Sequence, residues 1–135
     1  MNYDIYHSSI TYFPLLPLSK TASFECKVLD IRQMPAQVLF PHWDDEFEFI
    51  YVLSGMMEFR VRQKAFLVSS GEGFFLNTGE IHSACAYQSY DCRFVIYRIC
   101  PSVLFQTEDN PLYQKYIKPM VDHPSFGFLT FVPKV

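Results

Sequence analysis

The sequence predicts an all-β domain, a barrel or a sandwich, with a short helix near its C-terminal end. Strand-like runs recur at a spacing of about 8–12 residues between Phe24 and Cys100, and turn residues separate them. Half of the 135 residues are apolar and 18% are aromatic, which is enough to fill one core. A chain of this length suits one domain and is too short for two ordinary ones.

Residues 1–20 are rich in aromatic residues and contain Pro14 and Pro17, and we expect them to be an N-terminal arm or an edge strand. They carry too much apolar surface for a simple disordered tail. The barrel is expected to occupy residues 21–100. Its first strand is predicted over Phe24–Met34, where side chains alternate, and a second short strand starts within Gln37–Phe40.

The next run, Glu46–Leu53, is apolar on both sides of a period-two pattern, which is typical of a strand buried on both faces. Ser54-Gly55 predicts a turn. Glu58–Arg62 then alternates charged and apolar side chains, so we expect one of its faces to be in water. Gln63-Lys64 predicts a two-residue hairpin loop that leads into Ala65–Val68.

Ser69–Gly73 predicts a loop, and Phe74–Leu76 predicts a short strand. Asn77–Glu80 contains the Asn and Gly that a tight turn favours. Ile81–Tyr87 and Asp91–Cys100 complete the predicted strands.

The pattern changes in residues 101–135. Asp109-Asn110-Pro111 is typical of an N-cap followed by an early helical proline, and apolar residues then recur at helical spacing. Pro119 argues against a regular last turn of this helix. Phe126–Val132 is a final apolar segment.

The charge balance argues against a nucleic-acid-binding surface in this chain. The formal net charge is −3 and the basic residues are scattered, whereas a surface that follows phosphates needs clustered Lys and Arg. The densest basic group is Arg60, Arg62 and Lys64, which a solvated hairpin end explains.

The four cysteines have no CxxC or zinc-ribbon spacing, and we expect them to be reduced. The first residues contain no basic region followed by an apolar run, so a secretory signal is not expected. No stretch approaches the roughly 20 apolar residues that span a bilayer. We therefore expect a soluble, cytoplasmic protein.

Histidines and carboxylates gather in two segments of the predicted barrel. Residues two apart on a strand face the same side, so His42, Asp44, Glu46 and Glu48 share a face if the strand is regular, whereas a bulge over Asp44–Glu46 would break that parity. A metal site would draw on His42, Asp44 and Glu48 from this segment. With His82 they make a suitable ligand set for a divalent transition metal. In the alternative, His82 is an ordinary residue of the barrel wall and arginines neutralise the carboxylates; the candidates are Arg60, Arg62 and Arg93.

The two segments resemble the two motifs of the cupin superfamily. HWDDEFEFIYVLSG (residues 42–55) reads HxDx3E with a glycine seven residues after the glutamate, and GEGFFLNTGEIHS (residues 71–83) contains Gx5NxGx2H. Together they look most like the cupin ligand-binding domain of AraC-type transcription regulators. The segment from Cys100 to Val132 is similar to the one that follows the barrel in that family.

The chain departs from the cupin pattern at three places. Asp44 replaces the second histidine, Asn77 replaces a proline, and Ala86 replaces a late asparagine. The loss of an imidazole weakens the case for a catalytic iron or manganese centre.

The resemblance implies a cupin barrel, a double-stranded β-helix, that senses a small polar metabolite and has no enzymatic activity. It also implies a homodimer, and DNA binding through a C-terminal helix-turn-helix domain that this chain does not contain. No cofactor is required, although a divalent transition metal is possible. The effector pocket is expected in the barrel lumen, lined by His42, Asp44, Glu48, Arg60, His82 and Tyr97.

Two alternatives stay open. One is a stand-alone, metal-dependent cupin enzyme of the dioxygenase or isomerase type, and the other is a dimerisation module with a filled barrel. The arm around Tyr12-Phe13-Pro14 either folds over the barrel mouth when ligand binds or is permanently docked.

Overall fold

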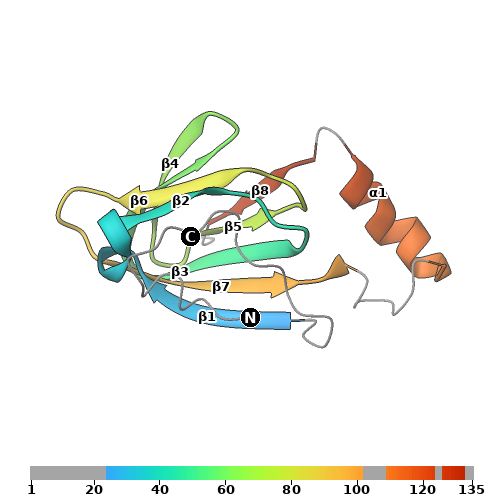
Figure 1. Ribbon diagram of the computed structural model, residues 1–135, viewed down its shortest axis with the longest axis horizontal. Helices are drawn as coiled ribbons and strands as arrows, with labels where there is room; N and C mark the ends of the chain where they lie inside the picture. Colours follow the sequence, from blue (N-terminus) through green and yellow to red (C-terminus); the bar gives the residue numbers. More distant parts are fainter. Residues whose placement is uncertain (1–23, 102–108, 124–125, 133–135) are drawn as a thin grey trace.

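The computed structural model describes residues 24–101, 109–123 and 126–132, which form a β-barrel followed by a short helical segment (Figure 1). The strands, in chain order, are β1 (Phe24–Asp30), β2 (Val38–His42), β3 (Phe47–Val61), β4 (Lys64–Ser69), β5 (Gly73–Leu76), β6 (His82–Ala86), β7 (Cys92–Ile99) and β8 (Phe128–Phe131). The mostly-β prediction is confirmed. The predicted N-terminal arm, residues 1–20, lies outside the described residues.

One long strand joins the two faces of the barrel. The first half of β3 lies in a sheet with the order β1-β7-β3-β5-β8, and its second half pairs with β4 and β6, the latter pairing in turn with β2. All of these pairings are antiparallel. Because β3 belongs to both sheets, its side chains reach both the polar and the apolar part of the interior.

The turn predicted at Ser54-Gly55 is wrong, because β3 continues through these residues. The pairing with β7 shifts by one residue between Val52 and Ser54, which is a β-bulge. Gly55 has a φ of 83°, a conformation that glycine adopts without strain. The strand therefore bends at this point and changes partners without reversing direction.

The β3–β4 hairpin is present but begins one residue earlier than predicted. Arg62 and Gln63 form its two-residue loop, with φ values of 50° and 63°, and Val61 pairs with Lys64. Two consecutive residues with positive φ are typical of the type I′ turn, whose twist matches that of the flanking strands.

The first strand is shorter than predicted. β1 ends at Asp30, whose carboxylate accepts a hydrogen bond from the Arg32 backbone N–H at 3.0 Å. This bond caps a short 3-10 helix, η2 (Ile31–Gln33), and a second one, η3 (Pro35–Gln37), follows it. The side chain of Asp30 thus offers the backbone a local alternative to further strand pairing.

The C-terminal helix forms as predicted, and it extends beyond Pro119. Asn110 caps it, because its Oδ1 accepts from the Leu112 N–H at 2.8 Å. A π-helical turn, η5 (Tyr113–Ile117), leads into α1 (Lys118–Asp122). Pro119 follows the π-helical turn directly and lies inside one continuous helical run, so it removes one N–H donor from that run without ending it.

Apolar packing divides into two clusters. The larger one fills the barrel and includes Phe59, Phe74, Phe94 and Ile96. The smaller one lies between the outer face of the β1-β7-β3-β5-β8 sheet and the helical segment, and its buried members are Phe47, Phe75, Tyr113 and Ile117. Figure 1 shows α1 at one end of the barrel. Met120 and Val121 of α1 pack against this second cluster.

The described residues contain no helix that is long and apolar enough to cross a membrane. All four cysteines are free of disulfides.

The bend at Gly55 generates a stability prediction. A Cβ at Gly55 would lie 1.7 Å from the Asp91 carbonyl oxygen, which is backbone, whereas a Cβ at Gly79 would meet nothing within 4 Å. We expect Gly55→Ala to lower the free energy of unfolding by about 4 kcal/mol or to prevent folding. Gly79 also has a positive φ, 76°, so Gly79→Ala should lower the free energy of unfolding by only about 1–2 kcal/mol through backbone strain. Urea denaturation of both variants measures the difference, and equal losses would contradict the steric account.

Candidate functional site

Four of the predicted site residues converge at one end of the barrel interior. His42 ends β2, Asp44 lies in the β2–β3 connection, Glu48 is in β3 and His82 begins β6. All four are buried, and one ligand atom from each lies within 4.8 Å of the others. The convergence predicted from their spacing is therefore observed.

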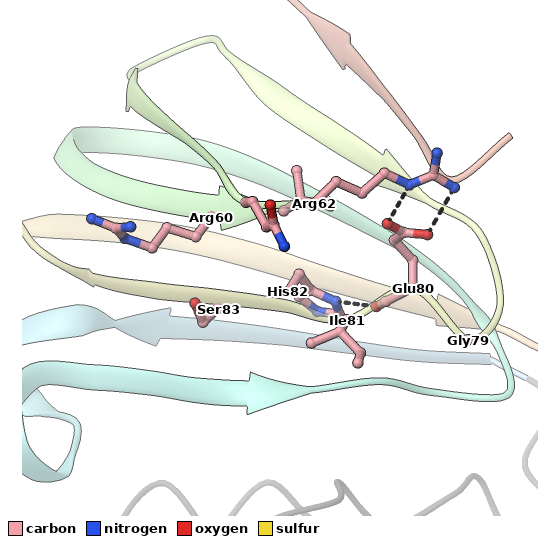
Figure 2. A pocket seen from close by; sticks show the side chains of 9 residues that line it. Arg60, Arg62, Gly79, Glu80, Ile81, His82 and Ser83 are labelled. Atoms are coloured by element: carbon pink, nitrogen blue, oxygen red, sulfur yellow. Dashed lines mark hydrogen bonds and ion pairs between the residues drawn. The ribbon is translucent and has the colours of Figure 1, made fainter. Parts of the chain in front are cut away.

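Backbone carbonyls orient both imidazoles toward the interior. The Nδ1 atom of His42 lies 2.8 Å from the Phe40 carbonyl oxygen, and that of His82 lies 2.9 Å from the Glu80 carbonyl oxygen. Figure 2 shows the second of these contacts. An imidazole that donates its Nδ1–H to a carbonyl keeps the lone pair of the neutral ring on Nε2. Both Nε2 atoms can therefore act as ligands inside the barrel.

A buried arginine, Arg98, neutralises this acidic end of the barrel. Its Nη2 atom donates to Asp44 Oδ1 and Glu46 Oε2, each at 3.0 Å, and its Nη1 atom lies 3.5 Å from Glu25 Oε2. In the sheet register Arg98 stands between Glu25 of β1 and Glu48 of β3. The side chain is fully buried, so its charge is compensated by carboxylates in place of water.

Sequence reasoning missed Arg98 although the chain carried a signal for it. Residues of one parity in β7 are apolar and face the core, namely Cys92, Phe94 and Ile96, and Arg98 continues that series. A basic residue on the inward face of a strand needs carboxylate partners. The acidic residues of the first motif supply them, and the inward-facing series of β7 extends to Arg98.

The prediction that Arg60 lines the lumen is wrong. Its side chain is 57% exposed and pairs with Glu58 at 3.2 Å on the outer face of the barrel. Figure 2 shows its guanidinium pointing away from His82. The buried neighbours Phe59 and Val61 take the inward positions, so alternation along β3 places Arg60 outside.

Tyr97 also faces outward. It pairs across the sheet with Cys26 and stacks on Phe24, with ring centroids 6.1 Å apart. Its neighbours in β7, Ile96 and Arg98, are the fully buried ones. The prediction that Arg62 or Arg93 neutralises the carboxylates of the cluster is also wrong. Arg62 pairs with Glu80, and Arg93 is exposed.

Burial and neighbouring charges move the pKa values of the four residues in opposite directions. Burial, together with His82, lowers the pKa of His42 to about 3. Burial, together with Glu48, raises the pKa of Asp44 to about 10 against the effect of Arg98. Burial also opposes the charged forms of His82 and Glu48, but their mutual attraction outweighs it. The pKa of His82 is therefore raised and that of Glu48 is lowered.

The cluster contains buried polar atoms whose partners lie only within the cluster. Both carboxylate oxygens of Glu48, Oδ2 of Asp44 and Nε2 of His82 have no hydrogen bond to any other part of the described chain, and Glu48 accepts one from Asp44 or His82 only where these hold a proton. His82 Nε2 does lie 3.3 Å from Glu48 Oε2, which is an ion pair when the ring is protonated. Unsatisfied buried groups in a native protein point to a bound partner such as a ligand, an ion or water.

The same donor set fits a divalent transition metal. Two imidazole nitrogens with their Nδ1 atoms anchored, and two carboxylates, offer nitrogen and oxygen ligands from one small volume. His42, Asp44, Glu48 and His82 would hold such an ion.

Comparison with known proteins identifies the type of domain. The family described as AraC-like ligand binding domain matches residues 27–127. An uncharacterized HTH-type transcriptional regulator, YdeC of Bacillus subtilis, is 28% identical over 88 residues. That match covers 65% of this chain but only 29% of the regulator, so the chain spans less than a third of its length.

Solved structures show the same barrel. The cupin domain of Schizosaccharomyces pombe Cnp3 matches with a TM-score of 0.52 and 18% identity, over 61% of this chain and 59% of that one. A cupin protein from Bacteroides fragilis matches with a TM-score of 0.50 and 15% identity, over 58% and 66%. The polyketide cyclase RemF from Streptomyces resistomycificus has a TM-score of 0.51 and 26% identity, over 58% and 55%. The fold is therefore a cupin barrel with one short C-terminal helix.

The charge network around Arg98 generates a second prediction. Arg98→Met leaves the buried carboxylates without their cation and should lower the free energy of unfolding by about 3–5 kcal/mol. The loss should be larger at pH 8 than at pH 5, because burial raises the pKa of Glu25, Arg98 no longer opposes that rise, and protonation at low pH removes the charge of this carboxylate. Arg60→Met is the matched control on the surface and should change stability by less than about 1 kcal/mol. Equal effects of the two variants in urea denaturation would contradict the role of Arg98.

Proposed function

The chain belongs to the family of AraC-like ligand-binding domains, and we propose that it senses a small polar metabolite and passes the signal to a DNA-binding domain. The observation that carries this proposal is the family match over residues 27–127, which includes both cupin-like motifs and the helical segment after the barrel. The unsatisfied polar atoms of the cluster supply a place for the metabolite.

The chemistry of the cluster favours a ligand that has hydroxyl groups. Glu48 and Asp44 offer oxygens that accept hydrogen bonds, and His82 offers a nitrogen whose role follows its protonation. Phe59 stacks on His82, with ring centroids 5.8 Å apart, and gives the site an apolar wall. A few convergent polar groups beside aromatic rings are typical of small-molecule sites. A bound divalent metal would supply a Lewis acid that draws an oxygen of the metabolite to the same residues.

The transcriptional part of the proposal comes from the relative. YdeC is an HTH-type regulator, and this chain matches only a part of it. We propose that the barrel works as part of a homodimer, with DNA bound by a helix-turn-helix domain outside residues 1–135. Binding of DNA by the barrel itself is not proposed, because its charge is negative overall.

A cupin enzyme is the second candidate. The likeness to the cyclase RemF at 26% identity and the buried His, Asp and Glu side chains favour it. The engagement of Asp44 by Arg98 favours the sensor, since one oxygen of a would-be metal ligand is already bound. The sensor and the enzyme can be distinguished by incubating the protein with each metabolite that raises its Tm and following that metabolite by mass spectrometry. A sensor returns the ligand unchanged, and catalytic turnover would establish the enzyme.

A screen of polar metabolites by thermal shift tests the ligand site. We expect a hydroxylated compound to raise Tm in the wild-type protein, because ligand that binds the folded state stabilises it. Glu48→Gln should weaken that binding about tenfold or more, since a charge-assisted hydrogen bond contributes about 1.5–3 kcal/mol. Arg60→Met, on the outer face, should respond as the wild type does. A compound that stabilises both variants equally would place the ligand elsewhere.

Metal binding should depend on pH in a defined direction. A divalent ion such as Co²⁺ must replace the protons that Asp44 and His82 hold, because the pKa of each is raised. Affinity for Co²⁺ should therefore increase from pH 6 to pH 8, and binding should release protons into a weakly buffered solution. Absorption titrations with wild type and His82→Ala measure both. Binding that is independent of pH, or that survives in His82→Ala, would exclude this site as the metal site.

A further inference from the structure

We propose that the β5–β6 loop, residues 77–81, couples the polar cluster to the C-terminal segment, which comprises α1, Phe126–Gly127 and β8. Occupancy of the cluster and docking of the C-terminal segment would then stabilise each other. The inference rests on the proposed function, because it names how a signal would leave the ligand site.

The loop contacts two residues of the cluster directly. The Gly79 N–H donates to the backbone carbonyl of Asp44 at 2.7 Å. The carbonyl of Glu80 accepts the hydrogen bond that fixes the His82 ring. A ligand that shifts Asp44 or rotates His82 must therefore either move the loop or break one of these bonds.

The same loop holds the C-terminal segment through one buried side chain. The Nδ2 atom of Asn77 donates to the carbonyls of Met120 and Phe126, at 2.6 Å and 2.7 Å. The backbone N–H of Asn77 donates to the carbonyl of Gly127 at 2.8 Å. Three hydrogen bonds from one residue thus connect the loop to the end of α1 and to the approach to β8. Figure 1 shows α1 outside one end of the barrel and β8 in the barrel beside β5.

A salt bridge closes over this junction. Arg62 donates to the two carboxylate oxygens of Glu80, at 2.7 Å and 3.2 Å, as Figure 2 shows. Both side chains pack against Gly127, where an added Cβ would come within 2.4 Å of Arg62 Nη2 and of Glu80 Oε2. Glu80 therefore contributes its carbonyl to the ligand site and its carboxylate to the docking of the C-terminal segment.

The loop is short and internally braced, so it can transmit a displacement. Asn77 Oδ1 accepts from the Thr78 N–H at 2.8 Å, and Leu76, just before the loop, pairs with Glu48. The contacts to the C-terminal segment and the contacts to the cluster are all made by residues within the four-residue stretch 77–80. Any coupling between the two sites is reciprocal in free energy, so it can be measured from either side.

The first experiment uses Co²⁺ alone as the probe and hydrogen exchange as a second readout. In the wild type, Co²⁺ should slow exchange at the amides of Phe126–Phe131. Asn77→Ala should abolish that slowing and weaken Co²⁺ binding about fivefold or more, which is the low end of ordinary coupling. Asn110→Ala is the matched control, because it removes the N-cap of the same helical segment without touching the loop. It should leave Co²⁺ affinity within about twofold.

A milder variant guards against misfolding of Asn77→Ala. Gly127→Ala places a methyl group against the ends of two flexible side chains, which can move aside. It should loosen the salt bridge and lower Co²⁺ affinity in the same direction. Wild-type affinity in both Asn77→Ala and Gly127→Ala, with faster exchange at Phe126–Phe131, would overturn the coupling.

A second experiment distinguishes failure of the coupling from failure of metal binding. If the wild type does not bind Co²⁺, Glu48→Gln serves as the perturbation of the cluster. Coupling predicts faster exchange at Phe126–Phe131 than in the wild type, measured relative to β1 in the same molecule. The same relative exchange in Glu48→Gln and wild type would overturn the coupling even if a metabolite is later found to bind.

Discussion

The buried charge of Arg98 is the constraint on which the polar end of the barrel depends. A guanidinium with no exposed surface requires carboxylates around it; Glu25 of β1 provides one, and Asp44 and Glu46 of the β2–β3 connection provide the others. These contacts hold the β2–β3 connection in place although it is not a strand. Because Asp44 is fixed in this way, its free oxygen Oδ2 stays beside His42 Nε2, 3.7 Å away.

The sequence predicted the strands well because the barrel is built on alternation, which local residues reveal. It failed where one residue decides the path: Gly55 converts an expected turn into a bend, and Asp30 ends a strand early. The bend depends on a partner distant in sequence, Asp91, whereas the end of β1 follows from a local hydrogen bond between the Arg32 N–H and Asp30. The motif residues His42, Asp44, Glu48 and His82 were predicted together because their spacing specified one lumen.

The two arginines show where alternation along a strand places a charge. Arg60 faces solvent between the inward-facing Phe59 and Val61, and the counter-charge of the cluster, Arg98, lies on the inward face of β7. Periodicity was sufficient to place both residues. Periodicity could not predict which carboxylates pair with Arg98. Its pairing with Glu25, Asp44 and Glu46 follows from the closure of the barrel and from the sheet register.

Two departures from the cupin pattern gain a physical meaning in this structure. Asp44, in place of a histidine, gives one oxygen to Arg98 and its backbone carbonyl to Gly79. Asn77, in place of a proline, has the N–H and the amide that hold Met120, Phe126 and Gly127, and a proline could donate neither. The first change ties Asp44 to β7 through Arg98, and the second ties the β5–β6 loop to the C-terminal segment. Both changes place connections to the rest of the chain beside the polar cluster, which supports the proposed sensing role.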